Sequence, residues 1–250
     1  MKWYQIQREK AARHIMDELR DRCCPLLVGY GGGIAFGLDT PGSDIVIRGI
    51  CTDPIEERID RKAVQEPLRL AQGDTVLYGL HSAAALLMEA DPAAIMLMGL
   101  QPEQYLYCGE AGHLLLENAT IFLSRRVYDS FWRSAFQLLR KLQAAVLKGS
   151  TDPKRLSREM AYLIALYSMG IDLLINGKIV TRRDEHKLLM EIHTGAYLGK
   201  NRVPTAEYER LLEYYMGSLR DAVIRTHLPS EPDTKKANAL MMEIAGRLPV

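Results

Sequence analysis

A glycine-rich segment and two aspartates are the residues of this chain whose types and spacing could do chemistry. Residues 29–33 read Gly-Tyr-Gly-Gly-Gly, and Asp44 opens a β-branched run eleven residues after the last of these glycines. Glycines let backbone N–H groups approach a phosphate closely, and an aspartate at the start of the next strand can hold a divalent metal beside it. No Gly-Lys-Ser/Thr follows, so the segment is not a P-loop, and no long helix opens behind a G-x-G-x-x-G. By itself the pattern is equally typical of a tight turn.

Short strands on either side of the loop must position these residues. The apolar run 26–28 predicts a buried strand that leads into the glycines, and residues 34–43 are short and turn-rich. The β-branched run 44–51 predicts a second strand, and residues 74–78 predict another. Strand side chains alternate between two faces, so positions 44 and 46 are expected on the same face.

Helical patterns flank the strands and dominate the second half, which gives an α+β fold class. Asp91 followed by Pro92 is typical of a helix start, because an acidic N-cap precedes proline at the first helical position. Breakers and small polar residues cluster at 149–153 and predict a boundary between domains 1–149 and 150–250. The predicted helices cover about 5–22, 81–90, 92–99, 126–147, 155–175, 182–194, 205–226 and 234–247.

Segment 29–49 resembles the signature of the DNA polymerase β superfamily of nucleotidyltransferases, and more closely its predicted bacterial and phage branch linked to RNA repair. That branch typically reads Gly-Gly-Ser-Arg-Ala-Tyr-Gly, then Thr-Pro-x-Ser-Asp-x-Asp-x-Arg-Gly. Segments 74–78, 91–107, 160–169 and 228–233 resemble the family as well, so the likeness spans most of the chain. The matching signature positions are Gly31, Gly32, Ala35, Gly37, Thr40, Pro41, Ser43, Asp44, Arg48 and Gly49.

The resemblance implies a polymerase-β-like nucleotidyltransferase core, a small mixed sheet with flanking helices, followed by a helical domain. Active members transfer a nucleotidyl group from a nucleoside triphosphate to a hydroxyl with two divalent metals, here Mg²⁺ or Mn²⁺. By the same resemblance Asp44 and Asp74 would be the catalytic metal ligands. The nucleotide-binding residues would be Gly31, Gly32, Gly33, Ser43, Arg48 and Arg140.

Three departures from the pattern fall inside the signature. Gly33 stands where the family has serine, Ile34 where it has arginine, and Val46 where it has the second metal aspartate. Valine cannot ligate a metal, and removal of a single transition-state electrostatic contact commonly costs ~3–4 kcal/mol, or ~10²–10³ in rate. We therefore expect nucleotide or phosphate binding with catalysis weakened or lost.

Two other interpretations remain open. Asp39 or Asp53 could replace the missing carboxylate, which would leave an active nucleotidyltransferase with a remodelled metal site that acts on RNA or another acceptor. The chain could also be a non-catalytic helical scaffold with a chance glycine loop.

Composition restricts the partners and the location. The 250 residues carry a formal net charge of +1 and are 48% hydrophobic, which excludes disorder and a broadly basic nucleic-acid-binding surface. No stretch approaches eighteen apolar residues and the amino terminus has no apolar core, so we expect no membrane partner. Four cysteines, none in a C-x-x-C pair, favour reduced thiols and a cytoplasmic location.

A local basic stripe leaves RNA open as a partner. Arg126, Arg133 and Arg140 recur at seven-residue spacing along one predicted helix and could hold RNA or a triphosphate tail. A solvated face paired to nearby acids explains the stripe equally well. Met241 and Met242 could contact a second copy of the chain, although core packing explains them too.

Overall fold

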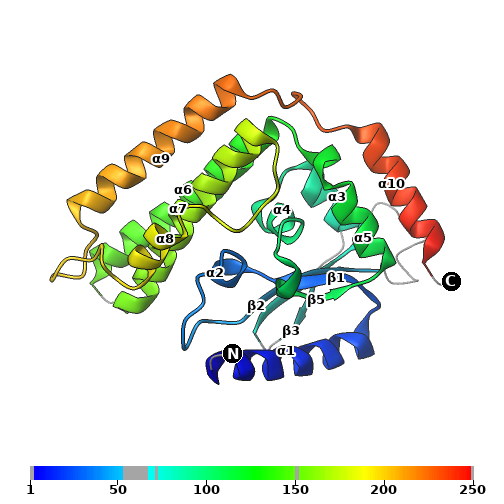
Figure 1. Ribbon diagram of the computed structural model, residues 1–250, viewed down its shortest axis with the longest axis horizontal. Coiled ribbons are helices and arrows are strands. Elements are labelled where there is room, and N and C mark those ends of the chain that lie inside the picture. Colours follow the sequence, from blue (N-terminus) through cyan, green and yellow to red (C-terminus); the bar gives the residue numbers. More distant parts are fainter. Residues whose placement is uncertain (1–2, 53–66, 71–72, 150–151, 249–250) are drawn as a thin grey trace.

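The structure, a computed structural model, describes residues 3–52, 67–70, 73–149 and 152–248. Its described strands form one mixed sheet in the order β3-β4-β2-β1-β5 (Figure 1). β1 is antiparallel to both β2 and β5, β2 is parallel to β4, and β3 is antiparallel to β4. The strands are β1 (Pro25–Tyr30), β2 (Val46–Cys51), β3 (Leu68–Leu70), β4 (Asp74–Gly79) and β5 (Tyr105–Cys108).

Helices cover both faces of the sheet, and the side chains divide between the faces with period two. α1 (Trp3–Arg22) lies against one face, where Leu19 packs with Val28 and Ile47. Leu27, the neighbour of Val28, points to the opposite face and joins the main apolar cluster. That face carries α3 (Leu80–Met88), α4 (Pro92–Leu97) and α5 (Glu110–Glu117), as Figure 1 shows.

The second half of the chain is helical and is organised around α7. α7 (Pro153–Asn176) packs against α6 (Arg126–Lys148), α8 (His186–His193) and α9 (Ala206–Arg225). It ends at Gly177, whose left-handed φ of 62° suits a glycine at the C-cap. Its length and composition would also suit a membrane span, but 67% of its most apolar window is buried inside the protein. α7 is therefore the mostly buried central helix of the helical half.

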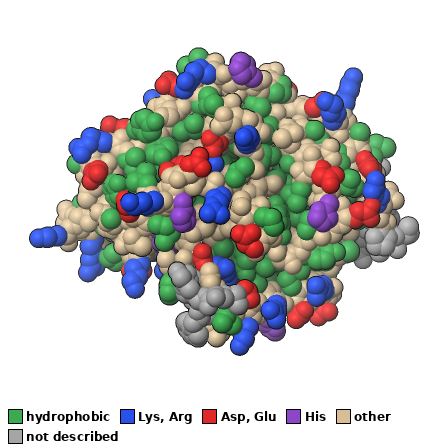
Figure 2. Space-filling view, viewed as in Figure 1, with side chains coloured by type: hydrophobic (Ala, Val, Ile, Leu, Met, Phe, Trp, Pro, Cys, Tyr) green, Lys and Arg blue, Asp and Glu red, His purple; other side chains and the backbone are tan. Residues whose placement is uncertain are grey.

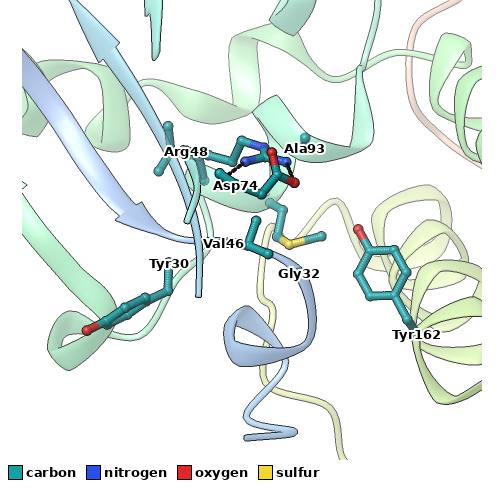
Figure 3. A pocket seen from close by; sticks show the side chains of 10 residues that line it. Tyr30, Gly32, Val46, Arg48, Asp74, Ala93 and Tyr162 are labelled. Carbon is teal, nitrogen blue, oxygen red and sulfur yellow. Dashed lines mark hydrogen bonds and ion pairs between the residues drawn. The ribbon is translucent and has the colours of Figure 1, made fainter. Parts of the chain in front are cut away.

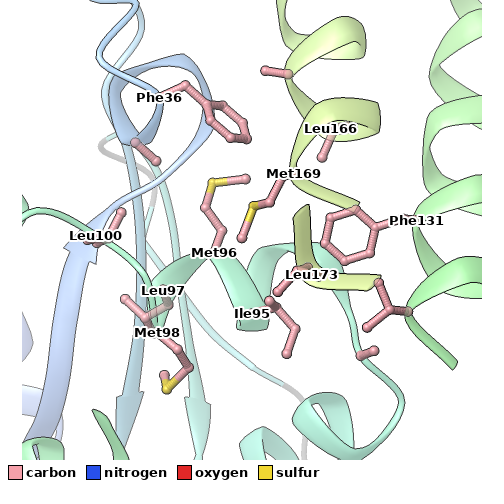
Figure 4. Packing of buried hydrophobic residues seen from close by; sticks show 14 of the residues in the cluster. Phe36, Ile95, Met96, Leu97, Met98, Leu100, Phe131, Leu166, Met169 and Leu173 are labelled. Carbon is pink, nitrogen blue, oxygen red and sulfur yellow. The ribbon is translucent and has the colours of Figure 1, made fainter. Parts of the chain in front are cut away.

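One continuous apolar cluster joins the two halves. Ile95 and Met96 of α4 lie beside Phe131 of α6 and beside Met169 and Leu173 of α7 (Figure 4). α10 (Thr234–Arg247), the last helix, returns to pack on α3 and α5, and Arg247 pairs with Glu110 at 2.5 Å. The boundary predicted after residue 149 coincides with the end of α6, but the apolar core continues across it. The division into two domains remains a prediction.

The predicted α+β class is confirmed, with most predicted elements present. α1, α3, α6, α7, α9 and α10 match the expected helices within a few residues, and Asp91 caps α4 by accepting from the N–H groups of Ala93 (3.0 Å) and Ala94 (3.1 Å). β2 begins at Val46 rather than at residue 44, because the pairing of β1 with β2 ends at Tyr30 and Ile47. α8 begins at His186, four residues later than predicted. The short α2 (Gly32–Ala35), β3, β5 and α5 were not predicted as elements.

Candidate functional site

A cavity of about 260 Å³ opens beside the glycine loop (Figure 3). We call it the glycine-loop cavity. The ends of β1, β2 and β4 form one side of it, and α4 and α7 form the other. The residues that matter for its chemistry are Gly31, Gly32, Val46, Arg48, Asp74 and Tyr162.

The loop is held tightly at the mouth of the cavity. The N–H of Gly31 donates to the carbonyl of Val46 at 2.8 Å, and Gly32 has a left-handed φ of 60°. A Cβ at Gly32 would lie 3.3 Å from Cγ2 of Val46, so the position has two reasons to be glycine. Gln104 fixes α2 behind the loop by donating from Nε2 to the carbonyls of Ile34 (2.6 Å) and Ala35 (3.2 Å).

Val46 lies where the resemblance implies the second metal aspartate. Its side chain contacts both Gly31 and Gly32, and it is paired with Asp74 across the parallel β2–β4 ladder. Arg48, two residues later, lines the same cavity, whereas Ile47 is buried beneath α1. A hydrocarbon side chain therefore occupies the position at which the second metal ligand is expected.

Arg48 and Asp74 form an ion pair inside the cavity. Nη2 of Arg48 lies 2.7 Å from Oδ2 of Asp74, and Nη1 donates to the carbonyl oxygens of Asp74 (2.5 Å) and Ile47 (2.9 Å). Figure 3 shows the two side chains meeting above Val46. The Asp74 side chain is 59% exposed and that of Arg48 only 20%, so the guanidinium is fixed while the carboxylate remains open to solvent.

The other predicted carboxylates are paired with arginines as well. Asp44 precedes β2, is 90% exposed and lies with Oδ2 3.6 Å from Nη1 of Arg158 on α7, outside the lining of the cavity. Asp39 lies 2.7 Å from Nη1 of Arg8 on α1. Asp53, the other candidate replacement, lies outside the described residues.

These pairs do not fit a two-metal cage. Asp39, Asp44 and Asp74 each face a different arginine, and of the three only Asp74 lines the glycine-loop cavity. Across the described part of the chain, no group of three His, Cys, Asp or Glu side chains is placed to hold a metal ion. Positive charge that a metal would supply near these carboxylates comes here from guanidinium groups of α1, β2 and α7.

Tyr162 is a site residue that the sequence did not single out. It comes from α7 and points toward the cavity in Figure 3, with its ring 5.7 Å from that of Phe36. Burial raises the pKa of Tyr162 to about 12, an effect that nearby Arg48 partly offsets. The phenol is therefore neutral at physiological pH and can donate a hydrogen bond into the cavity. Tyr162 follows Arg158 by four residues, so both side chains lie on one face of α7. This spacing is the sequence feature that could have identified Tyr162 as a site residue.

The remaining predicted site residues lie outside the cavity lining. A Cβ at Gly33 would meet only Cβ of Leu38, at 3.8 Å. Ser43 holds the turn before β2, where its Oγ accepts from the N–H of Thr40 at 2.9 Å. Arg140 is exposed on α6.

The basic stripe on α6 is partly neutralised. Arg126 pairs with Glu89 and, at 2.6 Å, with Glu231, whereas Arg133 and Arg140 are exposed. On the face shown in Figure 2, basic and acidic side chains are interspersed without a broad area of one sign. This distribution agrees with the near-zero net charge.

Comparison with known proteins gives no relative: no protein-family model matches the chain, and no curated protein is similar to it. Inferences about function therefore rest on the residues of the site.

Proposed function

We propose that this chain is a nucleotidyltransferase-like protein that binds a nucleotide through its phosphates and has lost most or all turnover. One observation carries the proposal: Val46 packs against Gly31 and Gly32 and is paired with Asp74, in a cavity that still has glycines of the loop and a mostly buried guanidinium. The loop keeps Gly31 and Gly32 but has Gly33 and Ile34 at the serine and arginine positions of the resemblance, and Val46 stands at the position of the second metal ligand.

The order of elements supports the nucleotidyltransferase-like core. β1 leads into the glycine loop and the short α2, β2 returns antiparallel to β1, and β4 lies parallel to β2 with a carboxylate at its first residue. A small mixed sheet of this kind with flanking helices is what the resemblance in segment 29–49 implies. A scaffold with a chance glycine loop would have no reason to place Arg48 and Asp74 beside that loop.

We propose further that the phosphates are held by arginine rather than by a divalent metal. A guanidinium binds phosphate oxygens in a bidentate manner, and Arg48 already lies in the cavity with its side chain mostly buried. The phosphate would displace the exposed Asp74 carboxylate from Arg48. Mg²⁺ or Mn²⁺ remains the expected cofactor only for the alternative of an active enzyme.

The test is nucleotide binding measured with and without divalent metal. Titration calorimetry with each of the four nucleoside triphosphates in EDTA should show binding, and added Mg²⁺ should not strengthen it. Arg48→Gln should weaken binding about tenfold, because it removes a charge-assisted contact. Arg133→Gln, an exposed arginine on α6 outside the cavity, is the matched control and should change little.

A transfer assay tests the loss of turnover separately. Labelled nucleoside triphosphate with Mg²⁺ or Mn²⁺ and RNA or protein acceptors should give no labelled product. Label transfer that stops in Asp44→Asn would overturn the loss of catalysis, and absence of binding for all four nucleotides would overturn the proposal itself.

A cytoplasmic location is also proposed. No disulfide bond joins Cys23, Cys24, Cys51 or Cys108, which agrees with a reducing compartment.

A further inference from the structure

Another cavity, of about 400 Å³, is lined by Arg158 of α7 and by residues outside the lining of the glycine-loop cavity. It is formed by the turn at residues 40–41, the first two turns of α7, and the end of α8 with the loop that follows. We call it the α7–α8 cavity. The side chains used below are Thr40, Lys154, Arg158, His193 and Thr194.

The lining of this cavity is basic. Lys154 and Arg158 both contribute to it, and no acidic side chain does among the residues that the structure describes. Lys154 makes no ion pair with a described residue. Among the described residues, the one ion pair of Arg158 is the 3.6 Å contact with the 90% exposed Asp44. Both cationic groups are therefore available to an anion.

The environment of His193 is separate evidence for a ligand in this cavity. The residue is only 7% exposed, it lines the cavity, and no hydrogen bond joins its ring to any other described residue. Neither ring nitrogen is among the described side-chain atoms that are fully buried without a partner, so the ring keeps some access to solvent and a ligand in the cavity can reach it. Burial lowers the pKa of His193, Arg158 lowers it further, and Asp39 partly opposes both. A neutral imidazole can still donate one hydrogen bond to a ligand in the cavity.

The start of α7 borders the cavity but is capped by an acid. α7 is 24 residues long, and Asp152 at its N-cap accepts from the N–H of Lys154 at 3.2 Å, which offsets the positive end of the helix dipole there. The hydroxyl groups of Thr40 and Thr194 already have partners: that of Thr40 pairs with the hydroxyl of Ser43 at 3.2 Å, and that of Thr194 donates to the carbonyl of Met190 at 2.8 Å. The two cations and the imidazole, which has no hydrogen-bond partner among the described residues, match the chemistry of a phosphate monoester.

We propose that the α7–α8 cavity binds the phosphate group of a phosphate monoester, as a site separate from the glycine-loop cavity. Arg158 and Tyr162, one turn apart on α7, place the two cavities next to each other along the same helix. This position suits the terminal phosphate of a second substrate. It could also receive a phosphate of the nucleotide itself, and the experiment separates these two sources.

The test follows the ring signals of His193 by NMR in protein labelled at histidine, with inorganic phosphate as the probe. His193→Asn assigns the signals. Phosphate should shift them saturably, with a dissociation constant near or below ~1 mM. Lys154→Gln should weaken phosphate binding about tenfold, which corresponds to loss of one charge-assisted contact. Lys154 is exposed, so the variant should fold normally.

Arg155→Gln is the matched control. Arg155 is the next residue of α7, is paired with Glu159 at 2.9 Å and does not line the cavity, so it removes the same charge without removing a contact. Phosphate affinity should change by less than about twofold. Equal weakening by Lys154→Gln and Arg155→Gln would overturn the proposal, as would the absence of a saturable shift at His193.

Addition of a nucleoside triphosphate separates the two sources of phosphate. If the cavity serves a second substrate, inorganic phosphate keeps its affinity when the nucleotide is saturating. If the nucleotide's own phosphate occupies the cavity, the nucleotide alone shifts His193 and competes with inorganic phosphate. Both results support a phosphate site here. Phosphate binding at His193 without nucleotide binding elsewhere would overturn the proposed function and leave this site standing.

Discussion

Asp74→Asn distinguishes an arginine-held phosphate from a metal-held phosphate by the sign of its effect. The substitution keeps the size of the side chain and leaves the backbone carbonyl of Asp74 in place, where it accepts from Arg48 at 2.5 Å. It removes the carboxylate that lies 2.7 Å from Nη2 of the same arginine. A phosphate then no longer competes with a fixed negative charge for the guanidinium, so nucleotide binding should become tighter.

The magnitude follows from two contributions. The Asp74 side chain is 59% exposed, so the ion pair that a phosphate must displace contributes ~0.2–1 kcal/mol. Repulsion between that carboxylate and a phosphate bound roughly 5–6 Å away adds ~1–3 kcal/mol at effective dielectric constants between 80 and 20, and salt reduces it. Screening by salt leaves the lower part of this sum, ~1–2 kcal/mol, which corresponds to ~5–30-fold tighter binding.

The assay is titration of the full chain with a nucleoside triphosphate in EDTA at two ionic strengths, repeated with Mg²⁺ or Mn²⁺ in place of EDTA. Asp17→Asn is the matched control: it removes the same charge from an exposed pair with Arg20 on α1, at 3.6 Å, and should leave the affinity within about twofold. Weaker binding in Asp74→Asn, with the loss appearing only when Mg²⁺ or Mn²⁺ is present, would refute the reasoning and restore Asp74 as a metal ligand.

Three further predictions concern the loop and the tyrosine of the same cavity. Gly32→Ala should lower the free energy of unfolding by ~1–2 kcal/mol, because φ is 60° and Val46 is close, whereas Gly33→Ala should be nearly neutral; chemical denaturation compares them. Val46→Asp should create a Mn²⁺ site with Asp74, detected by electron paramagnetic resonance, and no gain in Mn²⁺ binding would show that the two side chains do not face each other. Burial raises the pKa of Tyr162 to about 12, so the folded state favours the neutral phenol. Its contribution to stability should be complete below pH ~10 and lost as the pH rises from ~10 to ~12, and Tyr162→Phe should reduce that loss in urea titrations.

Local pattern was sufficient for much of the fold. Helical patterns in the sequence predicted α6, α7, α9 and α10, and the structure ends α6 and α7 at Gly149 and Gly177, both with left-handed φ. Val46 packs against the glycine loop, where the resemblance implies the second metal aspartate. β3 and β5 are three and four residues long, and such short strands are formed by pairing with their neighbours rather than by their own composition.

The candidate site was predictable only in part, because its decisive contacts are distant in sequence. Arg158 reaches Asp44 from the helical half, and Arg8 reaches Asp39 from α1. No local sequence pattern predicts that these side chains form ion pairs. Asp44 was expected to share the face of Val46 inside the site, but it lies before the paired part of β2 and is turned to solvent. The partnering of carboxylates with arginines emerges only when the chain is folded.

The return of α10 to α3 and α5 has a consequence for biosynthesis. Ala237, Leu240 and Ile244 are buried, and α10 packs against helices that belong to the first half of the chain. Until α10 has left the ribosomal exit tunnel, the apolar surface of α3 and α5 that it buries stays exposed. The first half therefore cannot complete its native packing before α10 emerges. A nascent chain stalled before α10 emerges should be captured by chaperones that bind exposed apolar segments, and a chain stalled after α10 has emerged should not be.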